Sequence, residues 1–191
     1  MPRRLPPEPL DPNEVRALLD ACADSPTGVR NRALIAVLWR SGLRVTEALS
    51  LHPKDLDATR GAVRVLRGKG GRSRTVGMDG AAFDLVAAWL AVRATWEVGP
   101  RSPLFCLADG TPVTSSYVRV LIPRLGRAAG IAKRVHAHGL RHTHAAELRT
   151  EGVDIGIISR QLVHRSIATT ATYLDHIAPV AVTEAMRGRV W

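Results

Sequence analysis

Tyr173 is one of only two tyrosines in the 191-residue chain, and it follows His164 by nine residues in the stretch HRSIATTATY. A phenol can act as a nucleophile when a base accepts its proton and cationic groups hold an electrophile against it. More commonly, a tyrosine packs its ring into the core and directs its hydroxyl at an acceptor. The choice between these roles depends on what the rest of the chain supplies.

Candidate cations and a candidate base lie upstream of this tyrosine. Arg44 stands at the junction of two predicted helices in SGLRVTE, and Lys69 stands between glycines that let the backbone approach a ligand closely. His138 and Arg141 are three residues apart, so a helix would place them on one face. A histidine beside an arginine places a proton-transfer group next to a guanidinium, whose paired N–H groups match the oxygens of a phosphate. Taken alone, Arg44 is equally typical of a solvated arginine at a helix end, and Lys69 is equally typical of a charged residue in a turn.

The histidines around Arg141 raise the question of a metal site. They are His136, His138, His142 and His144. His138 and His142 have the i, i+4 spacing of a ligand pair, but no acidic or cysteine ligand accompanies them, which disfavours a metal. We interpret His136 and His144 as core or surface residues, and His142 stays open. No metal or other cofactor is expected.

The distribution of charge indicates the class of partner. The formal net charge is +10, and the first 59 residues are balanced, with eight basic and eight acidic side chains. Residues 60–74 hold six basic residues and no acidic one, and residues 119–149 hold seven basic residues against Glu147 alone. Separate basic segments are typical of a folded surface that follows phosphates. Nucleic acid is therefore the expected partner.

The hydrophobic pattern predicts the secondary structure. Asp11, Pro12 and Glu14 occupy the N-cap, first-turn proline and capping-box positions of a helix of about three turns. Between residues 56 and 78 the period changes to alternation, with GAVRVLRG and RSRTVGM as strands joined by GKGG, and LDAT available as a third. Further helices are predicted at 28–41, 43–51, 79–96, 114–129, 138–151, 154–163, 167–177 and 180–188. The expected fold class is mainly α with a small antiparallel three-stranded β-sheet.

Composition sets the expected organisation and location. Residues 1–10 contain four prolines and few apolar residues, as linkers and extended tails do, and residues 11–191 are long enough for one domain. No apolar run approaches the ~18 residues of a membrane span, and no secretory signal is present. Cys22 and Cys106 are isolated and are interpreted as buried apolar residues. We expect a cytoplasmic, DNA-associated protein without a membrane partner.

Six positions in order carry a resemblance to a known family. Arg44, Lys69, His138, Arg141, His164 and Tyr173 resemble the catalytic set of the tyrosine recombinases, the phage-integrase and Xer-type family. The local contexts SGLRVTEALSL, GKGG, HGLRHTHA and HRSIATTATY are also similar to that family. The resemblance extends from about residue 11 over nearly the whole chain and implies the fold of the recombinase catalytic domain.

The resemblance implies site-specific DNA strand exchange, in integration, excision or resolution, by transesterification. Tyr173 would form a 3′-phosphotyrosyl link and release a 5′-hydroxyl. Arg44 and Arg141 would stabilise the charge that develops at phosphorus, and His138 would accept the phenol proton. Lys69 would protonate the leaving oxygen and His164 would hydrogen-bond a non-bridging oxygen. Glu47 is expected to orient Arg44 or nearby backbone, outside the catalytic set.

The resemblance also bears on partners. Double-stranded DNA would be bound through phosphate contacts, and the candidates in the two basic segments are Arg72, Arg74, Arg124, Lys133 and Arg134. Family members form homo-oligomers, up to tetramers, on DNA, with the C-terminal helix docked on a neighbour. Packing of that helix within its own chain, and a monomer in isolation, stay open.

Two departures and two alternatives accompany the resemblance. Val163 stands where the family has glycine, and the family's N-terminal core-binding domain is absent from the sequence, so we expect a catalytic fragment or a minimal member. One alternative function is DNA relaxation in the manner of a type IB topoisomerase. The other is a DNA-binding accessory protein that keeps the fold without catalysis.

Overall fold

The computed structural model describes residues 8–66, 73–162, 171 and 187. Within these residues the α-helices are α1 (Pro12–Asp20), α2 (Pro26–Arg40), α3 (Val45–Leu49), α4 (Gly80–Ala94), α5 (Ser115–Ala128), α6 (Ala137–Thr150) and α7 (Ile155–Leu162). A 3-10 helix, η1 (Pro53–Asp55), precedes the strands β1 (Leu56–Asp57), β2 (Ala62–Val65) and β3 (Arg74–Gly77). Apart from residues 171 and 187, which are helical, the helices predicted at 167–177 and 180–188 lie outside the described residues.

The N-termini of the first two helices show why they begin where they do. The Asp11 carboxylate accepts hydrogen bonds from the N–H groups of Asn13 and Glu14, and Glu14 accepts one in return from the Asp11 N–H at 2.8 Å. This is the predicted capping box. Helix α2 begins at Pro26, two residues before the predicted start, because Ser25 supplies the N-cap oxygen, which accepts from the Gly28 N–H at 3.2 Å.

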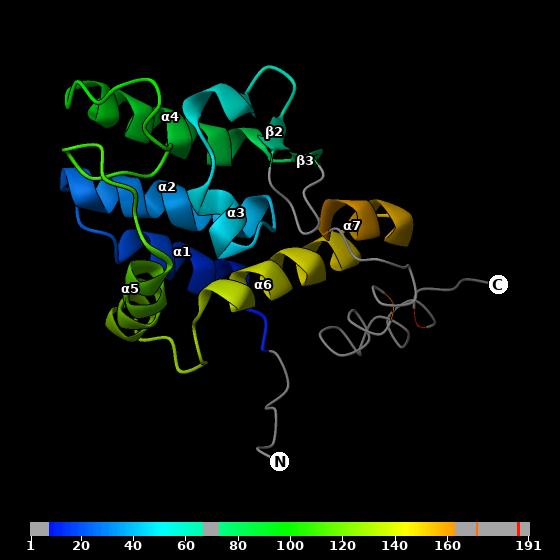
Figure 1. Ribbon diagram of the computed structural model, residues 1–191. Coiled ribbons are helices and arrows are strands. Elements are labelled where there is room, and N and C mark those ends of the chain that lie inside the picture. The colour runs from blue at the N-terminus through cyan, green and yellow to red at the C-terminus, as the bar shows by residue number, and fades with distance from the viewer. Residues whose placement is uncertain (1–7, 67–72, 163–170, 172–186, 188–191) are drawn as a thin grey trace, which may run out of the picture.

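The three strands form one antiparallel sheet in the order β1-β2-β3, which confirms the predicted sheet. Val63 pairs with Val76, and both are buried, so one face of the hairpin joins the core. Within this sheet β3 has β2 on one side only, and its other edge faces α7. Figure 1 shows α7 at this edge, next to the strand that follows the predicted lysine loop.

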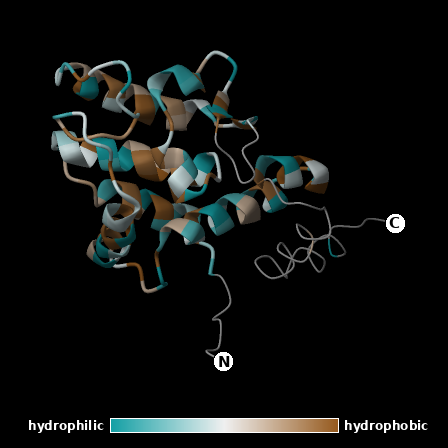
Figure 2. Cartoon of the chain, viewed as in Figure 1, coloured by the Kyte–Doolittle hydropathy of each residue, from teal (hydrophilic) through white to brown (hydrophobic). Residues whose placement is uncertain are grey.

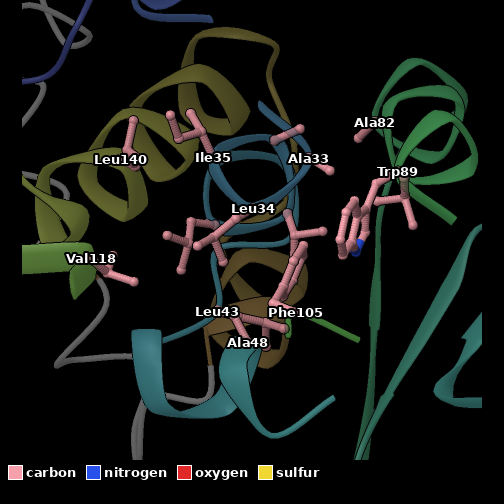
Figure 3. Packing of buried hydrophobic residues seen from close by; sticks show 14 of the residues in the cluster. Ala33, Leu34, Ile35, Leu43, Ala48, Ala82, Trp89, Phe105, Val118 and Leu140 are labelled. Carbon is pink, nitrogen blue, oxygen red and sulfur yellow. The ribbon is translucent and has the colours of Figure 1, made fainter. Parts of the chain in front are cut away.

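Helix α2 is the centre of the domain. It lies between α4 on one side and α1 and α6 on the other (Figure 1). Its middle residues, Ala33 through Leu38, are all buried, and Figure 2 shows brown apolar residues along this part of the helix. In Figure 3, Leu34 lies near Leu43 and Phe105, whereas Ile35 lies on the side of α2 that faces Leu140. The middle of α2 is thereby fixed by packing, and its C-terminal end leads to Arg44.

The chain enters the domain against α6. Leu10 is buried in the core, and its N–H donates to Thr143 Oγ1 at 2.9 Å. One residue earlier, the Pro9 carbonyl accepts a hydrogen bond from Lys133 Nζ at 3.1 Å. The packed part of the chain thus includes residues 9 and 10, which the sequence pattern assigns to a linker.

Candidate active site

Seven of the predicted site residues are described by the structure: Arg44, Arg74, Arg124, Lys133, Arg134, His138 and Arg141. The remaining four lie outside the described residues: Lys69, Arg72, His164 and Tyr173. The described residues form two groups. One surrounds the junction of α2, α3, β3 and α6, and the other lies on α5 and the segment that leads into α6.

Arg44 is held at the start of α3 by a sharp turn after α2. Gly42 makes this turn with a φ of +63°, and a Cβ at this position would lie 2.7 Å from the His144 ring. Only glycine fits the turn without strain. Arg44 follows as the N-cap of α3, with a side chain that is 37% exposed. The tight turn and the start of α3 together fix the backbone of Arg44, so its partly exposed guanidinium extends from a rigid position.

Glu47 links Arg44 to the sheet. Its carboxylate accepts hydrogen bonds from the Arg44 N–H at 2.9 Å and from an Arg44 side-chain nitrogen at 3.1 Å. It also accepts one from Arg74 Nη2, on β3, at 2.9 Å. The Glu47 and Arg74 side chains are only 5% and 14% exposed. Arg74, predicted as a phosphate contact, is therefore ion-paired inside the protein, where it connects β3 to α3.

The electrostatics of Glu47 follow from these contacts. Burial raises its pKa, but the hydrogen bonds from Arg74 and from the Arg44 N–H, together with the charges of the two arginines, outweigh burial and hold the pKa below its ordinary value. Because the pKa is lowered on folding, the charged form stabilises the fold above the unfolded-state value. That contribution is lost as the pH falls through the folded-state pKa.

Replacing Glu47 with glutamine should therefore lower the free energy of unfolding near neutral pH by about 3 kcal/mol, because two arginines lose a buried charged partner. The variant should also lose less stability than the native chain on acidification from about pH 5 to about pH 3. Urea unfolding followed by tryptophan fluorescence measures both effects. Parallel pH profiles for the two proteins would contradict the assigned role of this carboxylate.

His138 lies in the first turn of α6, close to the arginines. Desolvation lowers its pKa, and the positive charges of Arg141, His136 and Arg44 lower it further. Its ring stands edge-on to that of His142, with 4.5 Å between the ring centroids. Burial first, and then His138, lower the pKa of His142 to about 4. The lowered pKa of His138 favours its neutral imidazole, the form that can accept a proton.

Arg141 joins the two chain segments that lead to other predicted site residues. Its side chain is buried, and it donates one hydrogen bond to the Gly42 carbonyl and another to the Leu162 carbonyl. Gly42 lies two residues before Arg44, and Leu162 lies two residues before His164. One guanidinium therefore fixes both segments on α6, next to His138.

The second group borders a groove of about 690 Å³ beside His138. It is lined by the start of α3, one face of α5, Ile131 and residues 133–138, and these include four Lys and Arg residues: Arg119, Arg127, Lys133 and Arg134. Lys133 is also ion-paired with Glu14 at 2.7 Å. Arg124 is exposed on α5. Such a basic groove next to the arginine and histidine cluster suits a polyanion.

Among the described residues, no group of three or more His, Cys, Asp and Glu side chains is arranged to hold a metal ion. In the same part of the chain, no helix is long and apolar enough to cross a membrane. Cys22 and Cys106 are buried free thiols.

The sequence and the structure were compared with known proteins. The model of the phage integrase family matches residues 8–178. Tyrosine recombinase XerC of Rhodospirillum centenum is 36% identical over 191 residues, which cover 96% of this chain and 55% of the relative. Tyrosine recombinase XerD of Ralstonia nicotianae is 35% identical, with 90% and 56% covered.

Solved structures show the same fold. XerA recombinase superposes with a TM-score of 0.84 at 29% identity, over 99% of this chain and 68% of that one. XerH recombinase, in a post-cleavage complex with palindromic difH DNA, has a TM-score of 0.79 at 28% identity and covers 97% and 53%. The mainly helical fold with a three-stranded sheet is that of these recombinase domains. The chain spans about half the length of the curated relatives it matches.

Proposed function

The chain belongs to the phage integrase family, and on this premise we propose that it exchanges DNA strands at a specific site through a covalent 3′-phosphotyrosyl intermediate. The observation that carries the proposal is the position of Arg141. Its two carbonyl contacts bring the segment before Arg44 and the segment before His164 together on the helix that bears His138. One buried guanidinium therefore ties the segment that leads to Arg44 and the end of α7, which precedes His164 in sequence, to the helix that bears His138.

The cleavage step uses groups of this chain alone. The Tyr173 oxygen attacks phosphorus in line, a phosphorus–oxygen bond forms to the phenol, and the bond to the 5′-oxygen breaks. His138, neutral near pH 7, accepts the phenol proton, since a phenol has a pKa of about 10 and is mostly protonated there. Lys69 gives a proton to the leaving 5′-oxygen. Attack by a second 5′-hydroxyl reverses these steps, so the bond energy is conserved.

Charge at phosphorus is stabilised by the arginines. The pentavalent transition state gains negative charge on its non-bridging oxygens, and Arg44 and Arg141 would neutralise it with charge-assisted hydrogen bonds. Glu47 keeps Arg44 oriented while the transition state forms. His164 adds a hydrogen bond to a non-bridging oxygen.

The groove beside His138 supports DNA as the substrate. Arg119, Arg127 and Arg134 would contact phosphates along the duplex, and the exposed Arg124 would extend this surface. Arg72, outside the described residues, stays a candidate phosphate contact. We further propose that residues 11–191 form the catalytic domain and that the protein acts in the cytoplasm. On DNA it would form a homo-oligomer, up to a tetramer, with its C-terminal helix docked on a neighbour.

The decisive experiment uses a nicked suicide duplex that carries the cognate site. When a strand is cut next to the nick, the short 5′-hydroxyl fragment diffuses away and the phosphotyrosyl adduct is trapped. The native chain should give a band on a denaturing gel that contains both protein and labelled DNA. Relaxation of a plasmid without the site, at a rate comparable to recombination, would instead indicate a topoisomerase. DNA binding without an adduct would indicate the accessory role.

Replacing Lys69 with alanine should slow cleavage by about 10²- to 10⁴-fold, the usual contribution of a positioned proton donor. The loss should shrink greatly on a substrate with a 5′-bridging sulfur, because a thiolate leaves without a proton. Single-turnover rates on the two substrates give this comparison. Equal losses on both would remove Lys69 from the role of general acid.

A further inference from the structure

Gln161 joins three segments of the chain through one carboxamide. Its oxygen accepts a hydrogen bond from the Gly77 N–H at 2.9 Å, and its nitrogen donates to the Gly77 carbonyl at 2.8 Å. The same nitrogen donates to the Ser41 carbonyl at 3.1 Å. The amide thus pairs with the open edge of β3 as a neighbouring strand would, and it also binds the end of α2.

The orientation of this amide is set by its partners. Rotating it by half a turn would place its oxygen against the carbonyls of Gly77 and Ser41 and leave the Gly77 N–H without its acceptor. The His144 ring lies on the same side, with 3.5 Å between its Nε2 and the Gln161 nitrogen. Burial, followed by the charges of Arg40 and Arg141, lowers the pKa of His144 to about 4. The ring is therefore neutral near pH 7 and does not repel the amide.

The three joined segments are those that position the proposed catalytic groups. Ser41 precedes the Gly42 turn into Arg44, and β3 carries Arg74, the partner of Glu47. Gln161 itself is followed by Leu162, whose carbonyl Arg141 binds. Gly77 has no side chain to restrain its backbone at the end of β3. The two hydrogen bonds from Gln161 therefore restrict the backbone at Gly77 more than they would at a residue with a side chain.

We propose that Gln161 is a positioning residue, whose carboxamide holds β3 and the end of α2 in register with α7 and so keeps the cleavage site assembled. The inference rests on the proposed function. It assigns to α7 a role besides packing: the helix fixes the sheet edge and the α2–α3 turn relative to Arg141.

The test compares Gln161→Met with Gln161→Glu in the full chain. Methionine keeps the length and removes all three hydrogen bonds, whereas glutamate keeps an acceptor but sets a negative charge against two carbonyl oxygens. Single-turnover cleavage of the suicide duplex at saturating DNA should fall about ten- to a hundredfold in Gln161→Met, and further in Gln161→Glu, because the reacting groups lose their alignment. The affinity for DNA should stay at the native value.

Hydrogen exchange supplies a readout that does not depend on activity. The Gly77 amide should exchange faster in Gln161→Met, whereas the Met78 amide, bonded to the Gly61 carbonyl at 2.9 Å, should keep its protection. Thr95→Val is the matched control, since it removes a side-chain bond to the Val92 carbonyl at an exposed site at the end of α4. Its cleavage rate should equal that of the native chain.

The outcomes separate the two proposals. A native chain that forms no adduct overturns the proposed function. A native chain that forms it, with Gln161→Met cleaving within about twofold of the native rate, overturns only the role of Gln161. Loss of DNA affinity in parallel with cleavage, or loss of protection at Met78, also overturns that role because it shows a general structural defect.

Discussion

Replacing Tyr173 with phenylalanine should abolish the covalent adduct with the suicide duplex, because the variant lacks the oxygen that attacks phosphorus. No other group of the chain is assigned that step, so the loss should be complete within the detection of a denaturing gel. DNA binding, measured by a mobility shift, should be nearly unchanged. An adduct that persists in this variant would refute the assignment of Tyr173 as the nucleophile.

The second tyrosine provides the matched control. Tyr117 lies on α5, where its hydroxyl accepts hydrogen bonds from Arg30 at 3.1 Å and from Asn31 at 3.0 Å. Replacing Tyr117 with phenylalanine should cost about 1–2 kcal/mol of stability, because partly buried donors lose their acceptor. The adduct should still form. The two substitutions delete the same atom from the same residue type, so they separate chemistry from folding.

Replacing Arg141 with lysine should produce the largest combined loss of activity and stability. A lysine keeps the charge, but its single ammonium lacks the fork that reaches two carbonyls on different segments. We expect cleavage to fall by about 10²- to 10³-fold or more, as for loss of a transition-state donor. The free energy of unfolding should fall by about 2–4 kcal/mol, since two buried carbonyls lose charged donors.

Two comparisons make the Arg141 result interpretable. Replacing Arg149, exposed in the last turn of the same helix, with lysine should change neither quantity. Replacing Arg44, whose side chain is 37% exposed, should reduce cleavage with a smaller loss of stability. Urea unfolding and single-turnover cleavage measure both effects. Native stability in Arg141→Lys would show that the carbonyl contacts do not hold the two segments together.

Local patterns in the sequence were sufficient for the fold class and for most helices. The Asp11 capping box and the alternation around Val63 and Val76 are short-range signals, and the structure confirms both. The early start of α2 had its own signal in Ser25 and Pro26, which the apolar pattern alone did not reveal. The 3-10 turn η1 at Pro53–Asp55 was not predicted, because three residues are too few to show a period.

The order of the motifs along the chain predicted the candidate site. The hydrogen bonds and ion pairs between its residues could not be predicted from the sequence. Glu47 was expected to orient Arg44, since it lies three residues away on one helix. Its second partner, Arg74, is 27 residues away and depends on how the sheet docks. Charge counts gave Arg74 and Lys133 the same phosphate-binding role as Arg134. In the structure, Arg74 is ion-paired with Glu47 and Lys133 with Glu14. These ion pairs form only when the chain folds, so charge counts along the sequence could not show them.

The contacts of Pro9 and Leu10 with Lys133 and Thr143 have a mechanical consequence. Thr143 lies on α6, two residues beyond Arg141, so the start of the described chain is tied to the helix that holds the proposed site. A pull on the chain ahead of residue 8 would be transmitted to this helix through a hydrogen bond and a buried leucine. The incoming chain is thus mechanically coupled to α6, and force or motion applied there would act on that helix first.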